Sequence, residues 1–261
     1  MGIKRELEIS QLPERYHHLE LTPTSDGVSD SVYLLGDIYV VKYFENISQE
    51  VLESEINLLN SLINLPVPKI VDSFRVNSRA VVIYSQILGE SIYNPSLDNI
   101  RDIGSFLREF HNQSRDIKSN NINLFRKERL LKLILDSKYQ PLLDIYRSID
   151  IELQDDGIIH GDLFVDNAKF IDDRLSGVYD FSDASIGDFL FDLAVVAISW
   201  CYDKSILNSE KLDILLQSYK IDISFTQFKP YIKYALLYYA TTRYIYKREY
   251  IELIYKIGDL K

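Results

Sequence analysis

Cysteine, an N-terminal secretion signal and long apolar segments are what this sequence lacks. Its single cysteine, Cys201, excludes an intrachain disulfide and a cysteine-rich metal site. The longest apolar run, 189–201, is shorter than the roughly 20 residues that span a bilayer, and Asp192 interrupts it. The N-terminal MGIKRELEIS carries charges where a signal peptide needs an apolar stretch. We therefore expect a cytoplasmic protein with no membrane partner.

Basic residues are also in the minority. The chain has 29 lysines and arginines against 39 aspartates and glutamates, a formal net charge of −10. Nucleic-acid binding depends on clustered basic residues, so we expect no nucleic-acid partner. The acidic excess permits a cationic ligand, but it also serves solubility alone. A length of 261 residues is enough for one large domain or two coupled lobes, and the composition leaves monomer and homodimer open.

The first part of the chain has a β-rich pattern with one helix. Residues 31–44 contain two strand-like runs around Gly36-Asp37, which is typical of a hairpin. Residues 48–64 carry apolar side chains at helical spacing, with Ser48 as the N-cap. Two further strand-like runs follow, at 69–76 and 79–87.

The pattern changes at Gly89. Apolar stripes after it predict helices around 100–110 and 125–149, residues 158–180 return to short strands and turns, and the chain beyond 187 reads as helix. We therefore predict an α+β, two-lobed fold. Its β-rich N-lobe covers residues 1–88, and its larger, mostly helical C-lobe covers 89–261.

The segment IIHGDLFVDNAKFIDDRLSGVYDFSDA, at 158–184, holds the most informative pattern. His160, Asp162 and Asn167 have the spacing H-x-D-x-x-x-x-N, and Asp180 follows after a short hairpin pattern. Asp162 on such a loop can orient an acceptor hydroxyl and accept its proton, while Asn167 and Asp180 supply the hard oxygen ligands that Mg²⁺ prefers. A polar turn is the alternative for any one of them. The four in this order predict phosphoryl transfer from ATP with Mg²⁺.

A kinase also needs a cation on the nucleotide phosphates, and Lys42 is the candidate. It lies in a strand pattern on a face shared with apolar residues, where a lysine needs a partner. Glu55, at the edge of the apolar stripe of the next helix, can supply that partner and hold the lysine towards the phosphates. The alternative is a lysine at a strand edge that extends into solvent.

Two further segments have positions suited to nucleotide binding. Ser25, Gly27 and Ser29 precede the hairpin, where a loop covering the phosphates belongs, although an ordinary turn fits equally well. Ser85 and Ile87 lie at the junction of the two lobes, where backbone groups can contact adenine. The preference between ATP and GTP stays open.

These motifs resemble the aminoglycoside phosphotransferase and choline kinase superfamily. The resemblance rests on HGDLFVDN, YDFSDA and GDFLFDLA, and on the upstream VVK, Glu55, PVP and IGSFLREFH. It implies a protein-kinase-like fold, Asp162 as catalytic base, and Asn167 and Asp180 as magnesium ligands. It also implies that His160 supports the loop and that Asp192 is a structural hydrogen-bond acceptor.

One branch of that superfamily, the type II homoserine kinases, is similar in more detail. The similarity covers residues 158–201, including the Trp200-Cys201 pair, and ALLYYATTR at 235–243. The chain departs from the branch at Gly161, where alanine is usual, at DFSDAS in 180–185, and at Leu237 in place of an arginine. The resemblance implies a small-molecule kinase, with homoserine or a similar amino-acid alcohol as the first expectation for the acceptor.

The acceptor should lie between the catalytic loop and the C-terminal helices. Candidates to contact it are Asp183, Asp188, Trp200, Tyr202, Tyr238, Tyr239 and Arg243. The tyrosines could form a cage for a cationic group, but burial of their rings in an amphipathic helix is the simpler interpretation. Arg243 could bind a substrate carboxylate, or it could form an internal ion pair, for example with Glu249.

Other functions are weighed against this expectation. An aminoglycoside kinase shares every catalytic residue, and a choline or sugar kinase is a further alternative. A nucleotide-binding pseudokinase or scaffold is disfavoured because Lys42, Asp162, Asn167 and Asp180 are all present. A protein kinase is disfavoured because the helix near 188 follows Asp180 too closely for a long activation loop.

Overall fold

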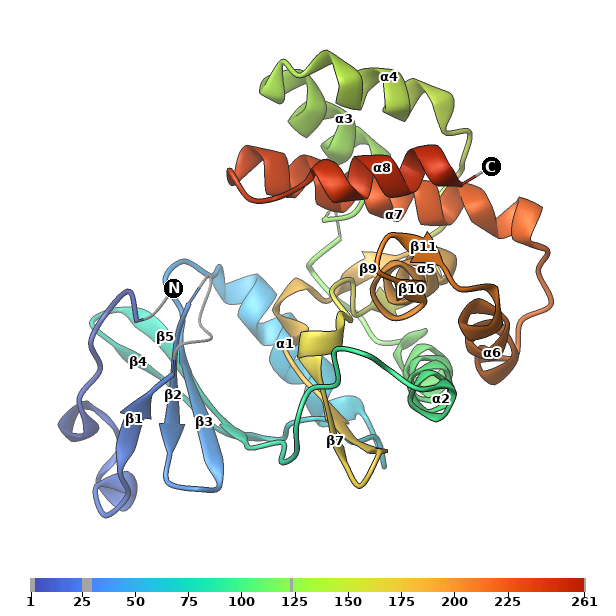
Figure 1. Ribbon diagram of the computed structural model, residues 1–261. Coiled ribbons are helices and arrows are strands. Elements are labelled where there is room, and N and C mark those ends of the chain that lie inside the picture. The colour runs from blue at the N-terminus through green and yellow to red at the C-terminus, as the bar shows by residue number, and fades with distance from the viewer. Residues whose placement is uncertain (1–2, 25–29, 123, 261) are drawn as a thin grey trace.

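The computed structural model describes residues 3–24, 30–122 and 124–260. Most of its N-terminal part is one antiparallel sheet with the strand order β1-β2-β3-β5-β4 (Figure 1). Its strands are β1 (Leu21–Pro23), β2 (Ser31–Leu35), β3 (Tyr39–Tyr43), β4 (Ile70–Val76) and β5 (Arg79–Ser85). Two short 3₁₀-helices, η1 (Ile9–Gln11) and η2 (Glu14–Tyr16), precede it. The predicted hairpin is confirmed: β2 pairs with β3 around Gly36, whose φ of +57° suits glycine.

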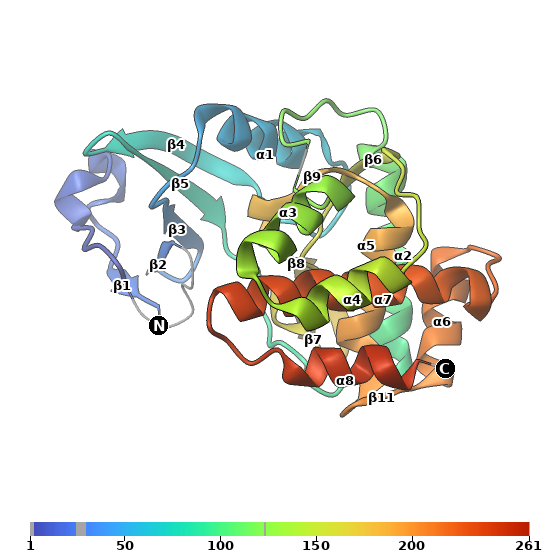
Figure 2. The ribbon, with the colours of Figure 1, turned by 90° about the horizontal axis from the view of Figure 1, so that it is seen from above.

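Helix α1 (Gln49–Ser61) lies between β3 and β4 along the chain and packs against both the sheet and the C-terminal part. It begins as predicted, with the Ser48 hydroxyl accepting from the Val51 N–H at 3.3 Å. In both views α1 lies between the sheet and the C-terminal helices (Figures 1 and 2). Its buried residues Leu52, Leu58 and Leu59 therefore belong to a core that continues into the C-terminal part.

The C-terminal part is mainly helical. Its helices are α2 (Leu97–Ser114), α3 (Lys127–Ser137), α4 (Gln140–Ser148), α5 (Phe189–Trp200), α6 (Ser209–Tyr219), α7 (Phe225–Ile245) and α8 (Ile251–Asp259). The predicted helical segment 125–149 is divided into α3 and α4 by Lys138, which adopts a left-handed conformation. Almost the whole of helix α5 is buried, and it packs against α7.

Three small antiparallel strand pairs lie in the described C-terminal part. They are β6 (Gly157–Ile159) with β9 (Ser185–Gly187), β7 (Ala168–Ile171) with β8 (Arg174–Val178), and β10 (Tyr202–Asp203) with β11 (Ile206–Leu207). Short 3₁₀-helices η3 (Val165–Asn167) and η4 (Phe181–Asp183) flank the second pair. The expectation of helix throughout residues beyond 187 is wrong at β10 and β11, where Lys204 turns the chain with a positive φ.

The junction between the two parts is fixed by backbone contacts. Glu90 exchanges two backbone hydrogen bonds with Phe170 of β7, at 2.9 and 3.0 Å. Gly89, with φ of +108°, allows this approach, because a Cβ there would lie 2.3 Å from the Phe170 carbonyl oxygen. The α+β, two-lobed architecture is confirmed, and the boundary at residue 88 stays a prediction. No helix in the described part of the chain is long and apolar enough to span a bilayer.

Candidate active site

A cavity of about 660 Å³ lies between the sheet and the β7–β8 hairpin. That volume is in the range of sites for cofactors and small molecules. One wall is apolar and comes from the sheet, with Val32, Leu34 and Val40, while the opposite side carries polar groups. Of the predicted site residues, the cavity is lined by Lys42, Glu55, Ser85, Ile87, Asn167 and Asp180.

Asp192 of α5 fixes the backbone of the loop that carries Asp162. The Asp192 carboxylate accepts from the backbone N–H groups of His160 and Gly161, both at 2.8 Å. It also pairs with His111 Nε2 at 3.0 Å. These bonds satisfy a fully buried carboxylate, as buried charge requires. The geometry agrees with the structural role predicted for Asp192.

His160 supports the same loop. Its Nδ1 accepts from the Asp162 N–H at 3.2 Å, so its Nε2–H donates to the Tyr179 carbonyl at 3.1 Å. Burial lowers the pKa of His160, which keeps the ring neutral. A neutral ring with both nitrogens engaged in the backbone agrees with the expected supporting role.

Asp162 follows Gly161 in this loop and contacts Asn167. The Asn167 side-chain amide donates to the Asp162 carbonyl at 2.7 Å and to its Oδ2 at 3.2 Å. Burial, together with the charges of Asp183 and Asp180, raises the pKa of Asp162 well above its ordinary value. A carboxylate whose negative charge is disfavoured in this way is a better proton acceptor, which suits a general base.

Asn167 and Asp180 have oxygens suited to Mg²⁺. The Asn167 NH₂ group is used by Asp162, which leaves its amide oxygen for a cation. Asp180 Oδ1 accepts from Lys42 and Ser182, which leaves Oδ2. Asp180 also has a positive φ of +63°, uncommon outside glycine and frequent at functional sites. Two hard oxygens on one cavity fit an ion whose other ligands are phosphates and water.

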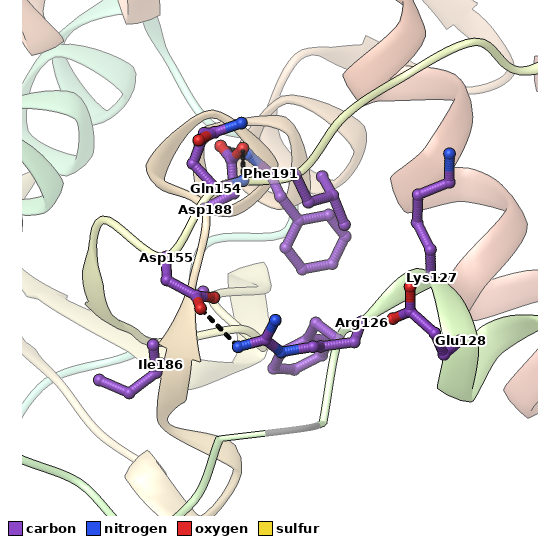
Figure 3. Close-up of a pocket in the computed structure, with 11 residues that line it drawn as sticks. Arg126, Lys127, Glu128, Gln154, Asp155, Ile186, Asp188 and Phe191 are labelled. Atoms are coloured by element: carbon purple, nitrogen blue, oxygen red, sulfur yellow. Dashed lines mark hydrogen bonds and ion pairs between the residues drawn. The ribbon is translucent and has the colours of Figure 1, made fainter.

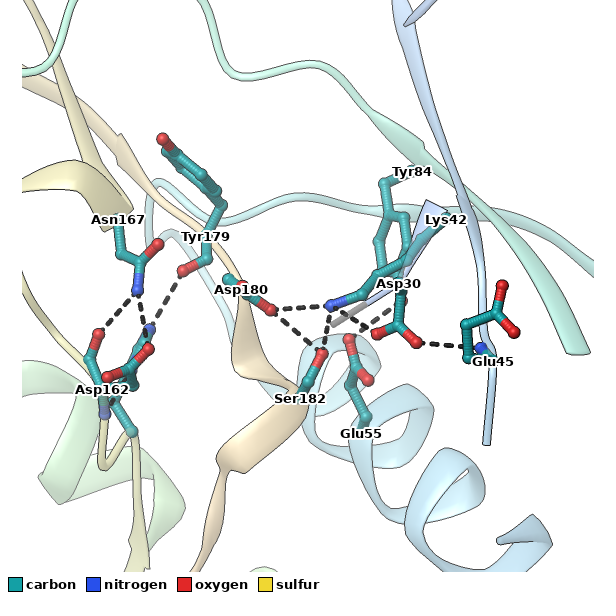
Figure 4. A network of polar contacts seen from close by, with 11 residues as sticks. Asp30, Lys42, Glu45, Glu55, Tyr84, Asp162, Asn167, Tyr179, Asp180 and Ser182 are labelled. Atoms are coloured by element: carbon teal, nitrogen blue, oxygen red, sulfur yellow. Dashed lines mark hydrogen bonds and ion pairs between the residues drawn. The ribbon is translucent and has the colours of Figure 1, made fainter. Parts of the chain in front are cut away.

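Lys42 contacts Asp180 and not its predicted partner (Figure 4). Its Nζ donates to Asp180 Oδ1 at 2.8 Å and to Ser182 Oγ at 2.5 Å, and lies 3.7 Å from Asp30 Oδ2. The prediction of a direct Lys42–Glu55 ion pair is therefore wrong. The reason is competition, because Asp30 and Asp180 approach Lys42 more closely. The Lys42 charge lowers the pKa of Asp180 to about 2.

Glu55 is buried beside this cluster. Its Oε1 accepts from the Tyr84 hydroxyl at 2.9 Å, and its Oε2 has no hydrogen-bond partner in the described part of the chain. Burial raises the pKa of Glu55 to about 7, against the opposing effect of the Lys42 charge. Glu55 is thus near enough to influence Lys42 without pairing with it.

The two other nucleotide predictions have different outcomes. Ser25, Gly27 and Ser29 lie outside the described residues. Ser85 and Ile87 line the cavity as predicted. The Ser85 N–H, however, donates to the Lys69 carbonyl, and the Ser85 hydroxyl accepts from the Lys69 N–H, both at 2.9 Å. Contact between a base and these residues stays a prediction.

Two of the predicted acceptor residues are not available to a ligand. Trp200 is 0% exposed, and its Nε1 donates to the Leu163 carbonyl at 3.0 Å. Asp188 is the N-cap of α5, and its carboxylate accepts from Gln154, Leu190 and Phe191 backbone N–H groups. Both assignments to the acceptor are therefore wrong, because these side chains stabilise the loop and the helix start.

Asp188 borders a second, smaller cavity of about 90 Å³ (Figure 3). Arg126 crosses it to pair with Asp155 at 2.5 Å. This cavity lies between the start of α3, the segment before β6, β9 and the start of α5. It shares no lining residue with the larger cavity, so the two are separate.

The other acceptor candidates are placed as follows. Asp183 is exposed, and its charge contributes to the raised pKa of Asp162. The ring of Tyr202 packs against Lys256 of α8, whose Nζ lies 4.7 Å from the ring centroid. Tyr202 is therefore a packing residue between β10 and α8. Arg243 is half-buried and has no ion pair in the described part of the chain, so the predicted internal pair with Glu249 is not formed.

Three tyrosines of α7 hold the backbone around the catalytic loop. Tyr239 donates to the Gly161 carbonyl, Tyr238 to the Leu124 carbonyl at 3.2 Å, and Tyr234 to the Phe125 carbonyl at 3.0 Å. Their rings are largely buried, which agrees with the packing interpretation. Their hydroxyl partners were not foreseen, because they belong to segments far away in the sequence.

Gly161 and Phe125 show the same close packing. Gly161 has φ of +76°, and a Cβ there would lie 2.2 Å from a ring carbon of Phe125. An alanine at this position would not fit against this ring. Phe125, Asp30, Ser182 and Tyr84 are site residues that sequence reasoning missed, since no local motif marks them.

Comparison with known proteins adds to this geometry. Residues 20–217 match the family model described as "Phosphotransferase enzyme family". A homoserine kinase of Parvibaculum lavamentivorans is 30% identical over 223 residues, which cover 75% of this chain and 69% of the relative. A homoserine kinase of Methylobacillus flagellatus is 27% identical over 206 residues, which cover 70% and 64%. The matches thus span about two thirds of the length of these relatives.

Solved structures share the fold. The streptomycin–ATP–APH(2″)-IIa ternary complex has a TM-score of 0.69 at 21% identity and covers 99% of both chains. The GDP complex of aminoglycoside 2′-phosphotransferase-IIIa has a TM-score of 0.68 at 18% identity, with 92% of both chains covered. These likenesses confirm the kinase-like fold that the sequence predicted.

Proposed function

Because this chain belongs to the phosphotransferase enzyme family and is a small-molecule kinase, we propose that it transfers the γ-phosphoryl group of ATP to the hydroxyl of homoserine or a similar amino-acid alcohol. The observation that carries this proposal is the position of Asp162. Its carboxylate has a raised pKa, contacts Asn167, and lies beside the cavity lined by Lys42 and Asp180.

The chemistry follows from these positions. Asp162 orients the acceptor hydroxyl and accepts its proton while the hydroxyl oxygen forms a bond to the γ-phosphorus. The bond between that phosphorus and the β,γ-bridging oxygen breaks, and ADP leaves. Bound Mg²⁺, held by Asn167 and Asp180, would neutralise charge on the phosphate oxygens. Lys42 supplies a further positive charge, for which it must exchange Asp180 for the phosphates.

The acceptor is supported by the relatives. Both relatives described above are homoserine kinases at 27–30% identity. An aminoglycoside is the second candidate, because the carboxylates of Asp162 and Asp183 influence each other and would suit an amine-bearing acceptor. A scaffold without turnover is disfavoured, because the proposed base, cation and metal ligands all lie at one cleft.

Acceptor-dependent ADP release tests the proposal. Purified protein with ATP and Mg²⁺ is given homoserine, serine, choline, kanamycin, a sugar or no acceptor. We expect release with homoserine or a related amino-acid alcohol, and a loss of about 10²–10⁴-fold in Asp162→Asn.

Asp172→Asn is the matched control, since Asp172 is exposed in the turn between β7 and β8, and it should retain activity. Turnover of kanamycin alone would replace the proposed acceptor with the second candidate. Release that is unchanged in Asp162→Asn would refute the proposed base.

A further inference from the structure

The ammonium group of Lys42 has three N–H groups, and the side chains of three residues lie within reach of it. Its Nζ donates to Asp180 Oδ1 and to Ser182 Oγ. The third neighbour is Asp30, whose Oδ2 lies 3.7 Å from Nζ. The proposed function gives up the bond to Asp180, because Asp180 then binds Mg²⁺. Among the described residues, Asp30 is the carboxylate that stays within 4 Å of Lys42.

The β2–β3 hairpin fixes the position of the Asp30 carboxylate. Asp30 directly precedes β2, and its Oδ1 accepts from the backbone N–H of Glu45, beyond the end of β3, at 2.9 Å (Figure 4). Ser31 pairs with Tyr43 in the ladder, so Asp30 and Glu45 lie at the same end of the hairpin. Lys42 comes directly before Tyr43 in β3. The carboxylate is therefore held beside Lys42 by the backbone, and its second oxygen faces the lysine.

The contact between Asp30 and Lys42 is largely shielded from water. Each of the two side chains is 14% exposed, and salt screens an ion pair in that setting less than a pair on the surface. Lys42 and Asp180 line the larger cavity, whereas Asp30 does not. Asp30 can therefore keep its contact with Lys42 when a ligand fills that space.

Glu55 is the competing carboxylate for this contact. Burial opposes protonation of Lys42, but the charges around it raise its pKa, and Glu55 contributes more to this than Asp30. Such an effect acts through space and sets no direction for the lysine side chain. Glu55 makes no ion pair within 4 Å in the part of the chain that the structure describes, and its Oε1 already accepts from Tyr84. Direct contact thus favours Asp30 as the residue that orients Lys42.

We propose that Asp30, in place of Glu55, positions the Lys42 ammonium group against the nucleotide phosphates once Asp180 binds Mg²⁺. The inference rests on the proposed function and adds a positioning residue to its nucleotide site. One Lys42 N–H stays directed at Asp30, and the two that Asp180 and Ser182 release become available to phosphate oxygens. Asp30 acts through Lys42 and needs no contact of its own with the phosphates.

A double-mutant cycle without nucleotide tests the contact itself. Asp30→Asn keeps an oxygen for the Glu45 N–H but loses the charge, so it should lower the urea midpoint of unfolding. In Lys42→Met the same substitution should leave the midpoint unchanged or raise it, because Asp30 and Asp180 have then lost their shared cation. Equal losses in both backgrounds would contradict the contact.

Calorimetric titration of the intact chain with Mg²⁺ and a non-hydrolysable ATP analogue tests the positioning and needs no acceptor. We expect Asp30→Asn to weaken binding about 5- to 30-fold, and Asp30→Glu to recover part of that loss. Glu55→Gln should weaken binding less than about threefold. In Lys42→Met, adding Asp30→Asn should weaken binding no further, because the lysine through which Asp30 acts is absent.

Asp37→Asn is the matched control. Asp37 is exposed in the turn at the opposite end of the same hairpin, between β2 and β3. The substitution removes one negative charge from the same lobe, as Asp30→Asn does. It should leave both the urea midpoint and the affinity for the analogue unchanged.

Several results would overturn the inference. A larger loss of affinity in Glu55→Gln than in Asp30→Asn would give the role to Glu55. Tighter binding in Asp30→Asn would show that Asp30 competes with the phosphates for Lys42, and an equal loss with and without Lys42 would make Asp30 structural only. Absence of analogue binding in the wild type would refute the proposed function and the inference with it. The expected couplings without turnover of any acceptor would support the role of Asp30 and count only against the proposed acceptor.

Discussion

Two regions of the proposed active site are stabilised by different interactions. In the first, the proposed nucleotide end, charged side chains from separate elements bind one another, with Lys42 of β3 between Asp30 and Asp180 (Figure 4). In the second, the proposed acceptor end, Tyr234, Tyr238 and Tyr239 of α7 donate to backbone carbonyls. The first arrangement depends on charge, and the second on neutral hydrogen bonds and packing.

This difference separates what can rearrange from what cannot. The Lys42–Asp180 pair can be exchanged for phosphate and metal, since each partner then gains an equivalent opposite charge. The tyrosine hydroxyls have no such replacement, because the carbonyls they satisfy stay in place. We therefore expect substitutions at the nucleotide end to act on ligand binding, and substitutions at the acceptor end to act on stability and on the geometry of Asp162.

Among the substitutions that test this comparison, the largest effect is expected for Lys42→Met. Loss of the ammonium group leaves the Asp30 and Asp180 carboxylates without their shared cation and removes a charge from the phosphates. We expect kcat/KM for ATP to fall by about 10²–10³-fold. Lys69→Met, an exposed lysine of the same lobe, should show little change. An unaltered kcat/KM for ATP in Lys42→Met would contradict the role given to this residue.

Gly161→Ala should have the next largest effect, and we expect it to lower the stability of the fold. The new Cβ would meet the Phe125 ring, and φ is +76°. We expect the free energy of unfolding to fall by about 2–4 kcal/mol, measured by urea denaturation. Gly258→Ala is the control, because a Cβ there meets nothing within 4 Å. Combining Gly161→Ala with Phe125→Leu should cost less than the two separate losses, and strict additivity would argue against the clash.

Tyr239→Phe should have a smaller effect, mainly on kcat. It removes one hydrogen bond to the Gly161 carbonyl while the ring still packs on Phe164, with centroids 4.7 Å apart. A loss of about 1 kcal/mol in positioning corresponds to roughly a fivefold lower kcat, with KM for ATP unchanged. Tyr234→Phe loses a similar bond, to the Phe125 carbonyl and not to the loop itself, and should lower kcat less. Equal kcat values in both variants would show that Tyr239 is only structural.

A gradual effect, spread over several pH units, is the pH dependence that Glu55 contributes to stability. Because burial raises the pKa of Glu55 to about 7 from an ordinary 4.5, the folded chain binds this proton more tightly than the unfolded chain. The free energy of unfolding should therefore fall as pH rises from 4.5 to 7, and Glu55→Gln should remove this component. Thermal unfolding at several pH values measures it, with exposed Glu53→Gln as control. A wild-type slope retained in Glu55→Gln would contradict the assignment.

Local spacing explains why the sequence could bring the proposed catalytic groups together. Asp162, Asn167 and Asp180 lie on one loop and the hairpin that follows it, so their mutual position depends on few intervening residues. The hairpin at Gly36 and the Ser48 cap were predictable for the same reason. Trp200 and Asp188 were assigned wrongly because closeness in sequence does not show which side chains helix α5 buries.

Sequence by itself determined the main strands of the sheet, most of the long helices and the groups expected to transfer a phosphoryl group. These depend on short-range periodicity, capping and motif spacing, and the kinase-like fold followed from the resemblance that those motifs carry. Only the tertiary structure decided that Lys42 binds Asp180 in place of Glu55 and that Phe125 packs against Gly161. These contacts join segments distant along the chain, and their geometry is fixed by how the sheet and helices pack around a shared core.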